Sequence, residues 1–207
     1  MVSIRKVKGG GVNRVLILAL TSWMLLAFAG EKSHFAYAPD GWKSETIPFP
    51  LGFAPEIDLQ GVEELRFAPG MYKPDQQDYF SYGFVWVLKG EIHVDVKFLT
   101  QNLLAYYQGL YTAVSKSETQ RTEPFFVQME VAGKGFSKNA QQSFSGSLDW
   151  REPFVTEKAQ TLILLVDTWF CPEAGKTLVM VLASPQVFDH PLWTALKSLD
   201  AVSCDGL

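Results

Sequence analysis

Few side chains in this sequence have the types and spacing that acid–base or metal chemistry needs. His93 and Asp95 are two residues apart, so they would share one face of a β-strand. There they could act as an acid–base pair or as two metal ligands. Any solvated strand face also produces such a pair, and we favour that simpler interpretation. Asp189 and His190 could join them in space, but a cap for the helix that follows explains Asp189 more simply.

Asp167 is the most informative single acid, because it interrupts an apolar run. A carboxylate in a covered strand must be paired or lie at the rim of the core. A structural partner such as Arg151 explains it more simply than catalysis does. Another charged cluster, formed by Glu63, Glu64 and Arg66, is interpreted as a surface network.

The sequence signatures of common enzyme classes are missing. There is no G-x-S-x-G elbow, no phosphate-binding loop and no dinucleotide fingerprint. The C-x-x-C and H-E-x-x-H patterns of common zinc sites are also absent. We therefore expect no catalytic, metal or cofactor site, and His93, Asp95, Asp167 and Asp189 remain as weak candidates only.

The two cysteines, Cys171 and Cys204, are an even number, which in an oxidising compartment suggests a disulfide. The bond would tie the C-terminal tail to the end of a strand. Because the cysteines are 33 residues apart, it would contribute roughly 3–4 kcal/mol in the chain-entropy model. Two unpaired thiols are the alternative. A catalytic thiol is not favoured, since no histidine lies nearby in sequence.

Residues 1–29 are predicted to be an export signal. Four basic residues precede an apolar run, and Ala27-Phe28-Ala29 supplies a signal-peptidase pattern with Gly30 as the first mature residue. The apolar run is about 15 residues, short of the roughly 20 that span a bilayer. An uncleaved membrane anchor is the alternative. We expect an exported, soluble protein of the periplasm or the extracellular space, without a stable membrane span after cleavage.

Charge and aromatic content limit the possible partners. The 207 residues include 18 basic and 22 acidic ones, and removal of the signal leaves 14 basic and 22 acidic, a net charge of −8. An acidic chain without a basic run is not typical of nucleic-acid binders. Aromatic residues make up 14% of the chain. Most should be core, although some could line a pocket for a small apolar ligand under the N-terminal segment.

Residues 79–88 are predicted to form the central strand, because they are uncharged and rich in aromatic and β-branched side chains. One face is bulky and the other, with Gly83, is small. The next helix is expected at 101–117 with Thr100 as its N-cap, after residues 91–96 continue the strand. We predict that this helix packs on the small face, so that Gly83 and Gly109 permit a close approach.

Further strands are predicted at 63–68, 125–131, 143–150, 160–170 and 177–183, with a last helix at 192–201. The short connection Pro172-Glu173-Ala174-Gly175 makes its flanking strands antiparallel neighbours, and their continuous apolar runs predict burial on both faces. Serine occupies every second position of residues 143–147, and these serines face either solvent or, less commonly, a polar cavity. Six prolines in residues 30–78 predict an irregular strap.

The fold class expected is therefore α+β: one domain in which the strap 30–78 and helices cover a mostly antiparallel sheet within residues 79–207. The element order is also compatible with the sandwich of the photosystem-extrinsic PsbP proteins, by analogy only. Three stretches resemble a group of bacterial secreted proteins of unknown function, clearest over about residues 42–90: Phe53-Ala54-Pro55, residues 61–70 and residues 82–86. The resemblance implies no activity and no site residue.

The leading hypothesis is an exported protein with a binding or structural role and no catalysis. One alternative is an unrecognised hydrolase or metal-dependent enzyme that uses His93, Asp95, Asp167 or Asp189. The other is a carrier of a small apolar ligand.

Overall fold

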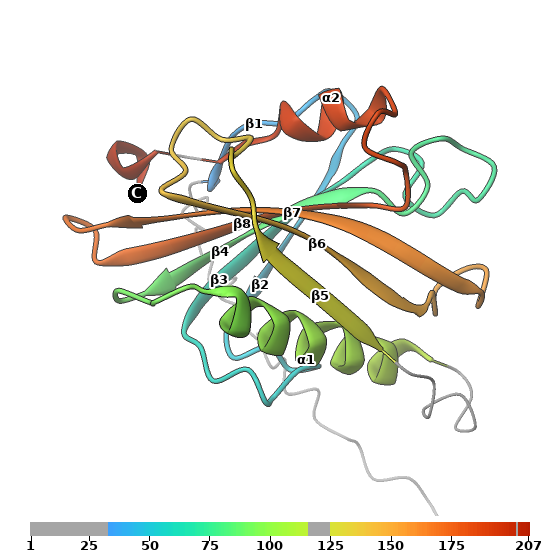
Figure 1. Ribbon diagram of the computed structural model, residues 1–207, viewed down its shortest axis with the longest axis horizontal. Coiled ribbons are helices and arrows are strands. Elements are labelled where there is room, and N and C mark those ends of the chain that lie inside the picture. The colour runs from blue at the N-terminus through green and yellow to red at the C-terminus, as the bar shows by residue number, and fades with distance from the viewer. Residues whose placement is uncertain (1–32, 116–124, 202) are drawn as a thin grey trace, which may run out of the picture. The chain divides into compact units, whose positions relative to one another are not determined.

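A seven-stranded sheet organises the computed structural model, which describes residues 33–115, 125–201 and 203–207 (Figure 1). Every strand is antiparallel to its neighbours, in the spatial order β2-β3-β4-β8-β7-β6-β5. The fold is therefore α+β and mostly antiparallel, as predicted. The strands run over β2 Lys43–Pro48, β3 Gly61–Phe67, β4 Tyr82–Lys89, β5 Phe126–Val131, β6 Gln142–Arg151, β7 Ala159–Cys171 and β8 Lys176–Ser184.

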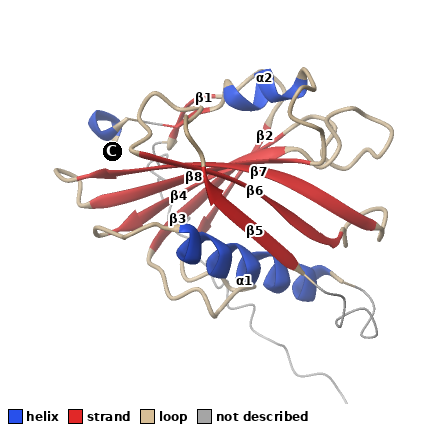
Figure 2. Cartoon of the chain, in the orientation of Figure 1, coloured by secondary structure: helices blue, strands red, loops and turns tan. Residues whose placement is uncertain are grey.

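Each face of the sheet packs against different elements (Figure 2). Helix α1, Val96–Val114, shares one hydrophobic cluster with the bulky face of β4, including Phe84 and Trp86. Helix α2, Leu192–Lys197, shares a second cluster with the small face of β4, including Val85. A two-stranded sheet of β1, Phe35–Tyr37, and β9, Asp200–Ala201, adds to that second cluster. The chain closes with a 3-10 turn, η2, at Cys204–Gly206.

Helix α1 begins earlier than the sequence predicted. Gly90, at φ +87°, turns the chain out of β4, so residues 91–95 form a loop and not a continued strand. Asp95 is the N-cap, and its carboxylate accepts a hydrogen bond from the Phe98 amide at 2.7 Å. The expected start at Gln101 with Thr100 as N-cap is therefore wrong, because Thr100 already lies inside the helix.

The predicted contact between Gly83 and Gly109 is also wrong, because α1 lies on the bulky face of β4. A Cβ on Gly83 would meet Leu199 at 2.6 Å, on the α2 side. A Cβ on Gly109 would meet the Phe53 carbonyl oxygen at 2.1 Å. Both glycines thus lie at close contacts, but with different partners on opposite faces.

The proline-rich segment is more regular than a strap. Its strands β2 and β3 extend the main sheet, and β1 belongs to the small sheet. The connection between β2 and β3 behaves as a covering segment, since four of its apolar side chains are buried in the α1-side cluster: Phe49, Leu51, Ala54 and Ile57. Met71, in the connection after β3, is buried in the same cluster.

The C-terminal half follows the sequence prediction closely. Strands β7 and β8 form an antiparallel hairpin across Pro172–Gly175, and most of their side chains are buried. Strand β5 is an edge strand with β6 beside it. The last helix is shorter than predicted, because residues 200 and 201 pair with β1. None of the helices in the described ranges is long and apolar enough to cross a membrane. The predicted export signal falls in residues 1–32, outside these ranges.

Candidate functional site

His93 and Asp95 lie in the loop that precedes α1. The His93 Nε2 and an Asp95 oxygen are 3.9 Å apart, and 84% of the His93 side chain is exposed. The Asp95 carboxylate already accepts the Phe98 amide as the N-cap. The pair is therefore a solvated turn and a helix cap. The prediction that both residues are solvated is confirmed, and the prediction that they lie on a strand is wrong.

Asp167 is buried on the α2 side of β7, where it fastens a loop. One carboxylate oxygen accepts hydrogen bonds from the backbone amides of Phe136 at 2.8 Å and Ser137 at 2.5 Å. Burial raises the pKa of Asp167, and hydrogen bonds from Ser143, Ser137 and Phe136 oppose that rise. Its partners are these groups and not Arg151, so the predicted pairing of Asp167 with Arg151 is wrong. The loop that Asp167 fastens is residues 132–141, which join β5 to β6, and we call it the hairpin loop.

Asp189 is exposed in the connection between β8 and α2. No side chain caps α2 at its N-cap position, and it is the His190 Nδ1 that accepts the Leu192 amide, at 3.1 Å. The capping role predicted for Asp189 is therefore wrong. Within residues 33–115, 125–201 and 203–207, no group of three or more His, Cys, Asp or Glu side chains is placed to hold a metal ion.

The cluster Glu63, Glu64 and Arg66 is buried and not on the surface, and it is divided between the two faces of β3. Glu63 is 0% exposed, and its carboxylate accepts the Trp86 indole N–H at 3.1 Å. Burial raises the pKa of Glu63 to about 7. Hydrogen bonds from Trp86 and Tyr106 oppose the rise, and the charge of Glu45 adds to it.

Glu64 and Arg66 point to the opposite face, where they form an ion pair at 2.5 Å. Glu64 also accepts hydrogen bonds from the Ser33 hydroxyl and the His34 amide, and the Arg66 guanidinium lies 4.7 Å from the centre of the Phe35 ring. Burial disfavours the charged carboxylate, but hydrogen bonds from the His34 ring and amide, from Ser33 and from Arg66 outweigh it and lower the pKa of Glu64 to about 2. This network fixes β1 to β3.

A hollow lined by both the loop before α1 and the hairpin loop is the candidate ligand site. We call it the end groove. It has a volume of about 850 Å³. Figure 1 shows the hairpin loop rising beyond the arrowhead of β5, away from α1 and toward β1 and α2. Residues of this loop and of the first turn of α1 both line the groove. The lining of the end groove comprises Val94, Asp95, Val96, Lys97, Val131, Ala132, Gly133, Lys134, Gly135, Ser137, Ala140, Gln141, Gln142, Ser143 and Phe144.

The end groove has an apolar floor and an apolar rim. Val94 and Phe144 are 3% and 4% exposed and belong to the α1-side core, so the floor is part of the packed core. Val131 at the rim is 73% exposed. A large aliphatic side chain that is open to solvent beside a hollow offers apolar surface to a bound molecule.

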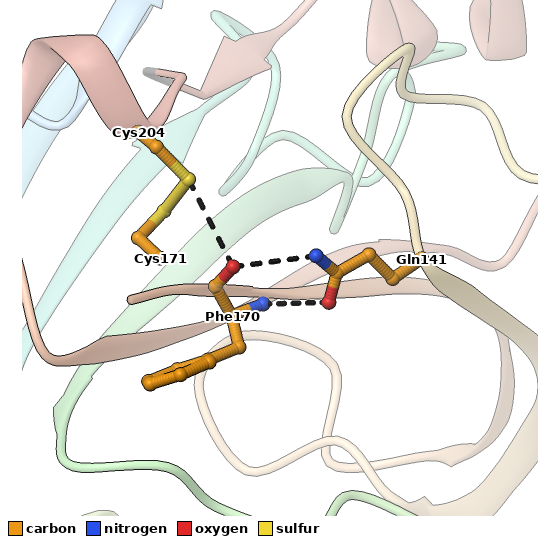
Figure 3. The surroundings of a disulfide bond; sticks show 4 residues. All are labelled: Gln141, Phe170, Cys171 and Cys204. Atoms are coloured by element: carbon orange, nitrogen blue, oxygen red, sulfur yellow. Dashed lines mark hydrogen bonds between the residues drawn. A yellow bond between two sulfur atoms is a disulfide. The ribbon is translucent and has the colours of Figure 1, made fainter. Parts of the chain in front are cut away.

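The hairpin loop that forms one wall of the groove is fastened at two points. Asp167 holds its middle, as described above. At its end, the Gln141 side chain forms a pair of hydrogen bonds with the Phe170 backbone: Oε1 accepts the amide at 2.9 Å and Nε2 donates to the carbonyl at 3.3 Å (Figure 3). The wall is therefore preorganised.

The predicted disulfide is confirmed. Cys171 at the end of β7 is bonded to Cys204 in the C-terminal tail, with a Cα–Cα distance of 5.2 Å. Cys171 directly follows Phe170, whose backbone holds Gln141, so the bond lies beside the second attachment point of the hairpin loop (Figure 3).

The charges in the lining of the end groove are Asp95, Lys97 and Lys134. Within the described part of the chain neither lysine forms an ion pair. Of these three residues, only Asp95 stands out from the sequence pattern; neither lysine does. The available signal was weak: Gly133 and Gly135 flank Lys134, which marks a loop and no more.

The aromatic side chains of β4 that face α1 are packed in the core. Phe84 and Trp86 are 0% exposed, and Phe84 stacks on Tyr106 of α1 with ring centres 5.5 Å apart. Trp86 meets Phe49 edge-on at 5.8 Å. These rings are core.

Comparison with known proteins adds no family and no function to this geometry, because the chain matches no protein-family model, no curated protein and no solved structure.

Proposed function

We propose that this chain is an exported, non-catalytic binding protein that holds a small molecule with an apolar body in the end groove. The observation that carries the proposal is the combination of a core-packed floor, Val94 and Phe144, with the exposed Val131 beside it. A volume of about 850 Å³ falls within the roughly 300–1,000 Å³ of small-molecule sites. Preorganised walls reduce the entropic cost of binding.

Export is supported by the disulfide between Cys171 and Cys204, since such bonds persist in oxidising compartments. The basic and apolar pattern of residues 1–29 supports it independently. Location in the periplasm, the resemblance to bacterial secreted proteins over residues 42–90 and the PsbP-like sandwich remain predictions.

The hydrolase alternative loses its geometric basis in the described residues, because its candidates are not gathered at one place. His93 and Asp95 lie at the start of α1, Asp167 is engaged by the hairpin loop and Asp189 lies in another connection. The apolar-carrier alternative is the one that the end groove favours, although at a different place from that expected.

The test uses N-phenyl-1-naphthylamine, a neutral aromatic probe whose fluorescence rises in apolar surroundings. We expect saturable binding to the wild-type protein. Gly133→Trp should abolish it, because a Cβ at Gly133 meets no atom within 4 Å and the indole ring would occupy the groove.

Gly52→Trp is the matched control. A Cβ at Gly52 also meets no atom within 4 Å, and Gly52 does not line the groove. This variant should bind the probe as the wild type does. The proposal is wrong if the wild type shows no saturable binding, or if Gly133→Trp binds as well as Gly52→Trp while both remain folded by circular dichroism.

A further inference from the structure

From the charges around the end groove, we infer that its natural ligand is a small amphipathic anion: an apolar body with one carboxylate, sulfonate or phosphate group that Lys97 and Lys134 bind. The inference rests on the proposed function, because it names the chemical class of ligand for the same groove.

The two lysines reach the groove from different elements. Lys97 is the second residue of α1, and Lys134 lies in the hairpin loop. Both side chains are exposed. Because Lys97 and Lys134 line the same groove as Val94 and Phe144, a molecule bound on that apolar floor lies beside both lysines.

Neither ammonium group is neutralised by the protein in the described residues. Lys138, further along the same hairpin loop, contrasts with them because its Nζ lies 3.6 Å from Asp200. Asp95 is the one acid in the lining, and its carboxylate already accepts the Phe98 amide and faces His93. The lining therefore carries two cations against one engaged carboxylate.

This local charge is opposite in sign to that of the whole chain, which is −4. An anion approaching an acidic protein is repelled in general and attracted only where cations are concentrated. The end groove therefore selects by charge as well as by apolar area. A neutral molecule would use the floor alone, and a cation would be disfavoured.

The experiment compares two probes that share one apolar body. 8-Anilinonaphthalene-1-sulfonate is the same aromatic amine with a sulfonate added. Two exposed ion pairs are each worth a few-fold at most, so we expect the wild type to bind the sulfonate about three- to tenfold more tightly than the neutral probe at low salt. That advantage should shrink as salt is raised, because exposed charges are screened.

The double variant Lys97→Gln with Lys134→Gln should lose this advantage and keep its affinity for the neutral probe. Lys138→Gln, in the same loop, is the control and should change neither affinity. If the neutral probe binds in the groove but the sulfonate binds no tighter, or if the double variant keeps the advantage, the inference is overturned and the proposed function stands. Failure of the neutral probe to bind would overturn the proposed function itself.

Discussion

Glu63 makes the stability of this protein depend on pH in a direction opposite to that of most carboxylates. The side chain is completely buried between β3 and α1, with the Trp86 indole and Tyr106 as its polar neighbours. Substitution of Glu63 by Gln keeps the shape and an acceptor for Trp86 but removes the charge. We therefore predict that Glu63→Gln stabilises the protein at alkaline pH and changes little at acid pH.

The magnitude follows from the pKa of Glu63, which rises from 4.5 to about 7 on folding. A raised pKa means that the folded state binds the proton more tightly than the unfolded state does. Stability is therefore lost as the pH rises from about 4.5 to about 7. At about 1.4 kcal/mol per pKa unit, the charged carboxylate costs about 3 kcal/mol above pH 7. Below pH 4.5 it is protonated in both states and costs nothing.

The assay is urea unfolding of wild type and Glu63→Gln at a series of pH values from about 4 to about 8.5. The difference in free energy of unfolding between the two proteins is compared at each pH, so that the contributions of other titrating groups cancel. With a slope of about 2 kcal/mol per molar urea, the variant's midpoint should lie about 1.5 M higher at the alkaline end. Glu173→Gln, at an exposed carboxylate in the β7–β8 turn, should show no such difference. A difference that stays constant with pH, or a variant less stable than wild type at pH 8.5, would refute the reasoning.

Three further predictions concern single contacts. Gly109→Ala should lower the free energy of unfolding by about 1–2 kcal/mol although alanine is the better helix former, because its Cβ would meet the Phe53 carbonyl oxygen at 2.1 Å. Gly133→Ala is the control and should leave the free energy of unfolding unchanged, because a Cβ at Gly133 meets open space. Equal melting temperatures for the two variants would contradict the predicted clash at Gly109. Cys204→Ser should lower the free energy of unfolding in urea by roughly 3–4 kcal/mol under oxidising conditions and should have no effect after reduction. Non-reducing peptide mapping that shows two free thiols would refute the disulfide itself. Asp167→Ala should speed hydrogen exchange in the hairpin loop, measured by mass spectrometry, and protection unchanged from wild type would show that Asp167 does not fasten it.

The parts of the fold that sequence reasoning predicted are those with a long local signal. The apolar runs of β7 and β8 and the short Pro172–Gly175 connection define an antiparallel hairpin without reference to the rest of the chain. In β5 and β6, the side chains of the two faces alternate over six or more residues, which is enough to identify each segment as a strand.

The start of α1 was missed because two local signals compete there. Residues 91–96 alternate polar and apolar side chains, which is typical of a strand, while Asp95 is equally typical of an N-cap. Gly90 at positive φ decides between them, and a positive φ is a property of the folded backbone. The packing face of α1 was predicted wrongly, because the prediction assumed that the helix needs the small face of β4. Tyr106 and Tyr107 instead pack among the bulky rings of the opposite face.

The buried charges and the end groove depend on contacts that are distant in sequence. Glu64 and Arg66 are stabilised by Ser33 and His34, about thirty residues away, so a local pattern of charged residues could only suggest a surface. The groove likewise joins residues 94–97 to residues 131–144. Neither segment carries a recognisable binding motif on its own.

The central claim is that the end groove binds a small molecule, and nuclear magnetic resonance of the ¹⁵N-labelled protein tests it most directly. On titration with N-phenyl-1-naphthylamine, the backbone amide signals of residues 94–97 and 131–144 should shift together and saturate with one dissociation constant. Signals from α2 and from β1, on the other side of the sheet, should stay in place. Shifts confined to other surfaces, or no saturable shift at any residue, would contradict the account.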